Sequence, residues 1–170
     1  IDYFANSGYE HSTVDDILWD ICRNVIARFG FEDCVIYLLD DEKKVLIQKA
    51  AMGSKSPNPY EIKNPIEIPI GQGIVGSVAL DGKSIIVNDT SKDSRYIVDD
   101  KARSSEISIP ILHEGKVIGV IDSEHSKKNF YTDDHQKNLT TLSIICGAKI
   151  SKALALEAMK KTKLELLELN

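Results

Sequence analysis

The short connections between strand-like segments constrain this fold most strongly. Four short apolar runs, rich in β-branched side chains, are typical of buried strands; they are residues 34–39, 45–51, 106–112 and 117–123. A polar turn that opens with Asp40 joins the first two runs, and residues 113–116 join the last two. Parallel neighbours need a crossover of about a dozen residues, which these turns are too short to supply. The sequence therefore predicts a mainly antiparallel sheet.

Two longer segments show helical periodicity. Residues 14–29 repeat apolar side chains three and four positions apart, which predicts a helix that buries one face. Ser12 or Thr13 is its expected N-cap, and Gly30 is its expected end. A second helix is predicted from Thr132, its expected cap, almost to the end of the chain.

Shorter elements complete the expected architecture. Residues 66–70 and 84–87 are predicted as strands, and residues 73–80 as a helix of about two turns. This order of elements predicts the α+β class. We expect a central antiparallel sheet of about six strands, helices on both faces and a long C-terminal helix.

Composition and charge argue against several kinds of function. The chain has 21 Lys and Arg against 26 Asp and Glu, and this formal charge of −5 argues against a nucleic-acid partner. No apolar run approaches the ~18 residues of a membrane span, so we expect no membrane contact and a cytoplasmic location. Cys22, Cys34 and Cys146 lie far apart without a CxxC motif, which favours free thiols. The histidines lack metal-ligand spacing, so we expect neither a metal nor a cofactor.

The glycine-rich segment from Gly71 to Gly76 matches the dinucleotide-binding pattern GxGxxG. Its surroundings do not fit that site, because Pro69 interrupts the preceding strand and the following helix is too short for a crossover. The next acidic residue at a strand end, Asp89, also comes earlier than the expected spacing of about twenty residues. We expect a tight strand-to-helix turn whose helix N-terminus could still offer N–H groups to a small ligand.

Five motifs in order give the chain its family resemblance: residues 68–76, 86–89, 105–111, 115–122 and 129–134. Together with the first helix they resemble a GAF domain over residues 13–153, of the kind found in bacterial sensor histidine kinases. The resemblance implies an antiparallel sheet with helices on both sides. It also implies one pocket between the sheet and the segment from the glycine loop to about Ser105. Such domains typically bind small molecules and bias an attached output domain.

Two branches of the family can be compared with this sequence. Cyclic-nucleotide-binding members carry an Asn-Lys…Phe-xxx-Asp-Glu pattern, but here His135 replaces the Glu and residues 123–125 do not match Asn-Lys. The pocket strands look closer to the free methionine sulfoxide reductases, along Glu106 and Asp122. In that branch cysteines occupy the glycine loop and the pocket loop, where this chain has Val75 and, around the second position, residues 98–100. Because sulfoxide reduction needs thiols, we expect no catalytic residue and no enzyme activity in this segment.

The strands predict a group of acidic side chains on one face of the sheet. Asp122 and Glu124 lie two positions apart on a strand and share a face. A three-residue loop with Gly115 left-handed would pair Leu112 with Lys116 and set Glu106 opposite Asp122. A two-residue loop would place Glu106 on the other face. We expect the three-residue loop; the opposite, core-facing side would then carry Ile107, Ile109, Ile111, Val117 and Ile121, and Ile118 would lie on the acidic side.

These acidic groups are the basis of the binding hypothesis. Neighbouring carboxylates repel unless a cation, an amine or protons neutralise them, so we expect a small amine-bearing metabolite such as an amino acid. The alternative is that they pair with Arg95, Lys101 or Arg103, or lie in solvent. The candidate ligand-binding residues are Glu106, Asp122, Glu124, Ser108, Tyr96, Val75, Gly76 and Asp89. Tyr37 could also line a pocket.

The ends of the sequence suggest a longer parent protein. We expect a GAF domain over residues 1–155, and the start of a signalling helix over residues 156–170 that leads to an output domain outside this sequence. Four leucines near the end, residues 164, 166, 167 and 169, predict a partner helix and a homodimer through the terminal helices. The expected function is small-molecule sensing for a signalling protein such as a sensor histidine kinase of a two-component system. The alternatives are a divergent free methionine sulfoxide reductase and a ligand-free dimerisation module.

Overall fold

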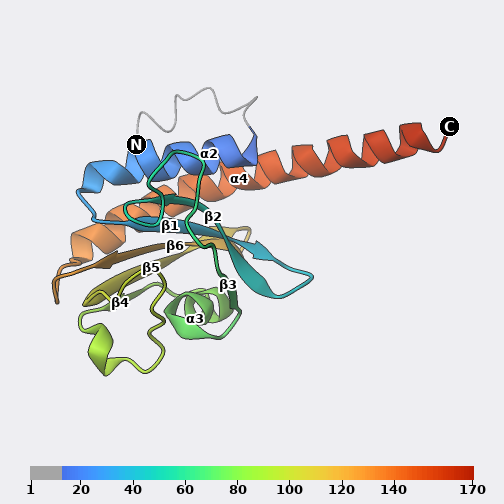
Figure 1. Ribbon diagram of the computed structural model, residues 1–170. Helices are drawn as coiled ribbons and strands as arrows, with labels where there is room; N and C mark the ends of the chain where they lie inside the picture. Colours follow the sequence, from blue (N-terminus) through green and yellow to red (C-terminus); the bar gives the residue numbers. More distant parts are fainter. Residues whose placement is uncertain (1–12) are drawn as a thin grey trace.

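The computed structural model describes residues 13–170 and contains one six-stranded antiparallel sheet (Figure 1). Its strand order is β3-β2-β1-β6-β5-β4, so the two long hairpins lie side by side in its centre. The strands are β1 Cys34–Asp40, β2 Val45–Met52, β3 Glu67–Pro69, β4 Ile85–Val87, β5 Ser105–His113 and β6 Lys116–His125. The α+β class, the antiparallel sheet and the number of strands are confirmed.

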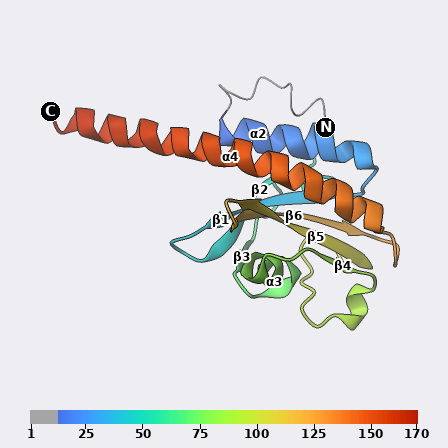
Figure 2. The ribbon, with the colours of Figure 1, turned by 180° about the vertical axis from the view of Figure 1, so that it is seen from behind.

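Helices cover both faces of the sheet, as predicted. The helix α2 (Val14–Asp20) and the 36-residue α4 (Asp133–Glu168) lie on one face, while α3 (Gly73–Asp81) lies on the other (Figures 1 and 2). The described residues also form three shorter helices: the π-helix η2 (Ile21–Val25) and the 3₁₀ helices η3 (Ile26–Phe29) and η4 (Thr90–Lys92).

The expected caps of the first helical segment are present. The Thr13 hydroxyl accepts a hydrogen bond from the backbone N–H of Asp16 at 3.1 Å, and Gly30 ends the segment with a φ of 74°. The other candidate cap, Ser12, lies outside the described residues. The segment that was predicted as one helix changes from α to π to 3₁₀ geometry along its length.

Alternation along the central strands creates two separate cores. Ile36, Ile107 and Ile121 point toward α2 and α4, where they pack with Leu18 and Leu142. On the other face, Val35, Tyr37 and Val120 pack with Val75 and Val78 of α3. The acidic side chains share this second face, so α3 and the loops beside it cover them.

The β5–β6 hairpin differs from the predicted register. Glu114 and Gly115 form a two-residue turn with φ values of 50° and 78°, and His113 pairs with Lys116. A bulge then shifts the register, because Leu112 pairs with Val117 whereas Ile111 pairs with Gly119. Glu106 therefore lies opposite Glu124 rather than Asp122, and the expected three-residue loop was wrong.

The bulge nevertheless returns Glu106 to the acidic face. A two-residue turn alone would have placed it among the isoleucines, and the extra residue, Ile118, reverses that displacement. Residues between the bulge and the turn lie on the opposite face from the one predicted. Ile118 packs against the helix-side core and Val117 against the α3-side core, the opposite of the predicted arrangement.

The helix α4 combines a packed half with an exposed half. Its last buried residue is Ala153, and the leucines at 164, 166, 167 and 169 are all exposed. The backbone N–H of Val14 donates to Glu157 at 3.1 Å, which fixes the start of α2 to α4. By length and composition alone α4 could cross a membrane, since an 18-residue window has a mean hydropathy of 1.4. Its buried residues pack on the sheet, as in the core helix of a globular domain.

Gly147 sets the close approach of α4 to β5. A Cβ at this position would lie 2.3 Å from the carbonyl oxygen of Leu112, which neither backbone could accommodate without moving. We predict that Gly147→Ala lowers the free energy of unfolding by about 1–3 kcal/mol, although alanine favours helices. Urea denaturation measures this, with exposed Thr141→Ala as the control on the same helix. A stabilised Gly147→Ala protein would contradict this packing.

Candidate functional site

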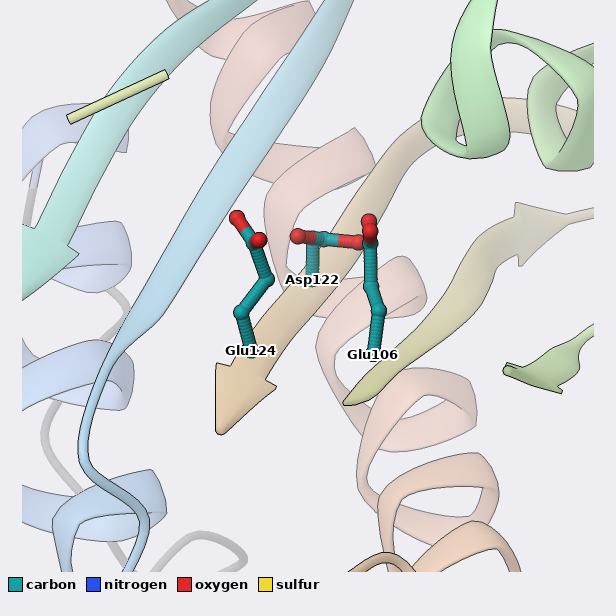
Figure 3. Close-up of side chains that lie close together, drawn as sticks. All are labelled: Glu106, Asp122 and Glu124. Carbon is teal, nitrogen blue, oxygen red and sulfur yellow. The ribbon is translucent and has the colours of Figure 1, made fainter. Parts of the chain in front are cut away.

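Three carboxyl groups gather on the α3 side of the β5–β6 pair. Figure 3 shows Glu106 on β5 and Asp122 and Glu124 on β6 rising from the same face, with the Asp122 carboxyl between the other two. Oxygen atoms from all three lie within 4.8 Å of one another. Each residue is at most 7% exposed, so water screens their charges poorly. The strands thus hold three acidic groups together inside the domain.

Two polar atoms at this cluster lack partners. Ser108 lies directly across the ladder from Asp122, and its hydroxyl oxygen is buried without a hydrogen bond. One carboxyl oxygen of Asp122, Oδ1, is likewise buried and unpaired. Unsatisfied buried polar atoms are costly, and they are common where a ligand completes the hydrogen bonding.

Burial changes the protonation of the cluster. It raises the pKa of Glu106 well above its usual range, and the adjacent Asp122 adds to the shift. The same cause raises the pKa of Glu124 to about 9 and that of Asp122 to about 6. At neutral pH the unliganded cluster therefore keeps protons that free carboxyls would have lost.

A loop segment, residues 93–103, closes over the carboxyls and is fixed at several points. The Tyr96 hydroxyl donates to Glu124 at 2.5 Å and accepts the backbone N–H of Arg103 at 2.9 Å. Asp99 pairs with the buried Lys55 at 2.6 Å and accepts from Gln48 at 2.8 Å. The position of this segment thus depends directly on one of the carboxyls.

A second buried network supports the base of the cluster. Asp33 accepts the backbone N–H of Glu124 at 2.6 Å and lies 3.4 Å from the guanidinium of Arg103. Arg103 also pairs with Asp100 at 2.8 Å. Arg103 and Arg95 pair with other carboxylates, Arg95 with Asp93, so neither of them forms the ion pair with the cluster that the alternative suggested.

The carboxyls border a small cavity of about 20 Å³, which is room for about one water molecule. Aliphatic and acidic side chains and one tyrosine surround it; they are Tyr37, Ile66, Ile68, Ile74, Val75, Ile97, Asp99, Glu106, Asp122 and Glu124. No lysine or arginine within residues 13–170 lines it. The three clustered carboxyls could also hold a metal ion, since oxygen donors suit hard cations such as Ca²⁺ and Mg²⁺.

Four of the eight candidate residues line this cavity: Val75, Glu106, Asp122 and Glu124. Two more lie beside it, because Tyr96 contacts Glu124 and Ser108 lies across the ladder from Asp122. Gly76 does not line it; it allows the backbone to approach Pro69, whose oxygen would lie 2.5 Å from an added Cβ. Asp89 lies elsewhere: it caps η4 and pairs with Lys128 at 3.3 Å, beside a different surface depression. Neither residue therefore lines the cavity beside the carboxyls.

Sequence reasoning missed the groups that surround the carboxyls. Asp99, Gln48 and Lys55 come from three different segments and meet only in the folded chain. Asp33 precedes β1 and gave no motif of its own. One usable signal was the acidic pair at residues 99–100, which lies in the segment expected to cover the pocket.

Comparisons with known proteins relate this arrangement to a family. The model of the GAF domain matches residues 11–150. Protein YtsP of Bacillus subtilis is 33% identical over 90 residues, which span 53% of this chain and 53% of YtsP. The free methionine-R-sulfoxide reductase of Escherichia coli is 28% identical over 126 residues, 74% of this chain and 67% of that protein. The chain thus spans about half to two thirds of the length of these curated relatives.

A solved structure agrees in fold. The free methionine-R-sulfoxide reductase of Neisseria meningitidis, in complex with its substrate, has a TM-score of 0.76 at 19% identity and covers 91% of this chain and 86% of that one. These relatives overturn the expectation that the segment is not an enzyme. Reductases are enzymes, and they share the family and the fold of this chain. Membership of the family therefore does not separate sensors from catalysts.

The raised pKa of Glu124 predicts that the stability of the protein depends on pH. Between about pH 5 and 9 the folded protein keeps a proton on Glu124 that the unfolded chain has lost. The free energy of unfolding should therefore fall as the pH rises through this window. We predict that Glu124→Gln reduces this slope by up to about 1 kcal/mol per pH unit.

Urea denaturation at pH 5, 7 and 9 measures the slope. The control is Glu165→Gln, which changes an exposed carboxyl near the end of α4 and should leave the slope unchanged. Equal slopes for Glu124→Gln and the unmodified protein would show that Glu124 ionises normally in the fold.

Proposed function

We propose a function on one premise: the chain belongs to the GAF domain family, whose model matches residues 11–150. Domains of this family are commonly ligand-sensing regulatory modules. We propose that this one binds a small amine-bearing metabolite between the sheet and α3. In this proposal the amine contacts Glu106, Asp122 and Glu124, and the bound state is passed on through α4.

The observation that carries this proposal is the buried acidic cluster with unpaired oxygen atoms. A protonated amine supplies one positive charge and three N–H donors in a compact group. That charge would take the place of the protons that otherwise neutralise the cluster, and the donors would satisfy Asp122 Oδ1 and the Ser108 hydroxyl. The cavity of about 20 Å³ matches the amine head alone. The remainder of the ligand would therefore displace the 93–103 segment.

The contacts of Glu124 suggest how binding would be communicated. An amine at Glu124 competes with the Tyr96 hydroxyl for the same carboxyl and so loosens the 93–103 segment. The strands β5 and β6 also carry α4 on their opposite face, with Gly147 against Leu112. A shift of these strands would reach α4. This route would suit a cytoplasmic multidomain signalling protein, with a sensor histidine kinase as our proposed context.

The exposed leucines of α4 support a further part of the proposal. Leu164 and Leu167 lie three positions apart beyond the packed part of the helix, at about 60% exposure each. Such a surface suits pairing with the same segment of a second copy. We propose a homodimer through the terminal helices, in which α4 relays the state of the pocket.

We predict that aliphatic amines bind the protein and that Asp122→Asn weakens this binding at least about tenfold, because the variant removes the principal negative charge of the cluster. Isothermal titration calorimetry measures the affinity, and thermal unfolding checks that the variant folds. The control is Glu165→Gln, far from the site.

Unchanged affinity in Asp122→Asn would remove the cluster from the binding site. Absence of binding by every amine tested would contradict the proposal and favour the ligand-free dimerisation module. Binding of Ca²⁺ or Mg²⁺ without binding of amines would identify the cluster as a metal site.

A second candidate function is reduction of free methionine-R-sulfoxide. The named reductases from two organisms favour it, and one of them matches 91% of this chain at a TM-score of 0.76. The reaction consumes two thiols and yields methionine, one disulfide and water. Cys22 and Cys34 lie together in the helix-side core, on the opposite face of the sheet from the carboxyls.

A turnover assay tests this candidate directly. With dithiothreitol as reductant, it predicts methionine formation from free methionine-R-sulfoxide that is lost in Glu106→Gln, and chromatography of the products measures it. The Cys22→Ser and Cys34→Ser variants then show whether the thiols of the chain take part. Methionine formation no faster than in a protein-free control would reject this candidate.

A further inference from the structure

We infer that the pocket selects primary amines, which keep all three N–H donors, over amines that carry methyl groups on the nitrogen. This inference rests on the proposed function and narrows its ligand class. It follows from the spacing of the three carboxyl groups, from the strands that carry them and from the unpaired oxygen atoms beside them.

The spacing of the carboxyl groups suits contact with a single nitrogen atom. One oxygen atom each from Glu106, Asp122 and Glu124 lies at most 4.8 Å from the other two. For three points at such separations, one position lies within about 2.8 Å of all of them, which is a normal N–H···O distance. Three acceptors at about 2.9 Å around a tetrahedral nitrogen would themselves lie about 4.7 Å apart. One nitrogen can therefore donate to all three residues, provided that it carries three N–H groups.

The strands hold this arrangement independently of the loop above it. Figure 3 shows that all three side chains rise from β5 and β6, and Glu106 pairs directly with Glu124 in the ladder. On the other face, the neighbouring residues Ile107 and Ile121 are packed in the helix-side core. A ligand that displaces the 93–103 segment would therefore leave the strands and their three carboxyls in place.

The carboxyl groups can accept N–H donors in either protonation state, because the C=O oxygen of a protonated carboxyl remains an acceptor. Two buried atoms at the cluster lack a partner: Asp122 Oδ1 and the hydroxyl oxygen of Ser108, which lies directly across the ladder from Asp122. The N–H that faces Asp122 Oδ1 could be shared with this hydroxyl, since one N–H can bond two acceptors. A primary ammonium group would thus satisfy the whole cluster.

Methyl groups on the nitrogen would remove these donors without removing the charge. Each one leaves a buried oxygen atom without a hydrogen bond, which is costly. Proteins recognise methylated ammonium groups with cages of aromatic rings instead. Among the described residues that line the cavity, Tyr37 is the one aromatic side chain, and Ile68, Ile74 and Val75 are aliphatic. The site therefore offers little to compensate for a lost N–H.

A series of methylated amines tests the inference on the unmodified protein. Butylamine, N-methylbutylamine, N,N-dimethylbutylamine and butyltrimethylammonium share one chain and one positive charge at pH 7, and they carry three, two, one and no N–H donors. Isothermal titration calorimetry at pH 7 gives each affinity. We expect butylamine to bind at least about tenfold more tightly than N,N-dimethylbutylamine, because the loss of one charge-assisted hydrogen bond to a buried group is enough for this ratio.

The Glu106→Met variant tests the contact with all three carboxyls. Methionine has a similar length but only a weak acceptor, so the N–H that is lost on methylation should no longer matter at this position. We expect the affinity ratio of butylamine to N-methylbutylamine to fall toward one in Glu106→Met. The ratio should be unchanged in the control Glu165→Gln, an exposed position near the end of α4. Thermal unfolding checks that both variants fold.

The outcomes separate this inference from the proposed function. Methylated amines that bind as tightly as butylamine would overturn the inference while leaving an amine pocket in place. A ratio in folded Glu106→Met equal to that of the unmodified protein would overturn the contact with three carboxyls. Absence of binding by all four compounds would overturn both the inference and the proposed function.

Discussion

The crowding of Glu106, Asp122 and Glu124 in a buried space determines how the rest of this domain is arranged. Three carboxyl groups whose oxygen atoms lie within 4.8 Å of one another cannot all be ionised away from water. The cluster therefore takes up protons or a cation. The surrounding structure helps to stabilise it. Asp33 fixes the backbone of Glu124, and Tyr96 donates to its side chain. The loop that covers the pocket is thus attached to the group whose charge a ligand would change.

The two faces of the sheet have different roles: one forms the larger core, and the other carries the candidate binding site. The isoleucines of β5 and β6 point toward α2 and α4 and form the larger core, whereas the acidic residues alternate with them and point toward α3. Because Ile107 and Ile109 hold β5 on one face, Ser108 and the neighbouring Asp122 can each leave an oxygen atom unsatisfied on the other. This division explains how a fold can tolerate buried carboxyls, and it places α4 where movement of the strands would reach it.

Much of the fold could be predicted from the sequence because its signals are local. Hydrophobic periodicity, the Thr13 cap and the short turns identified the elements, and alternation along β6 put Asp122 and Glu124 on one face. The hairpin shows the limit of such reasoning. We predicted a loop one residue too long. The bulge at Ile118, which no local sequence signal indicated, is what keeps Glu106 on the acidic face. The partners Asp99, Gln48 and Lys55 also remained hidden, since they meet only through long-range contacts.

Carbon-13 NMR of the side-chain carboxyls between pH 4 and 10 tests the account most directly, with Glu106, Asp122 and Glu124 assigned through their Gln or Asn variants. The account predicts that Glu106 and Glu124 remain protonated at pH 7, with Glu124 titrating near pH 9 and Asp122 near pH 6. A saturating aliphatic amine should shift these titrations to lower pH. Three ordinary titrations between pH 4 and 5, unaffected by amine, would contradict it.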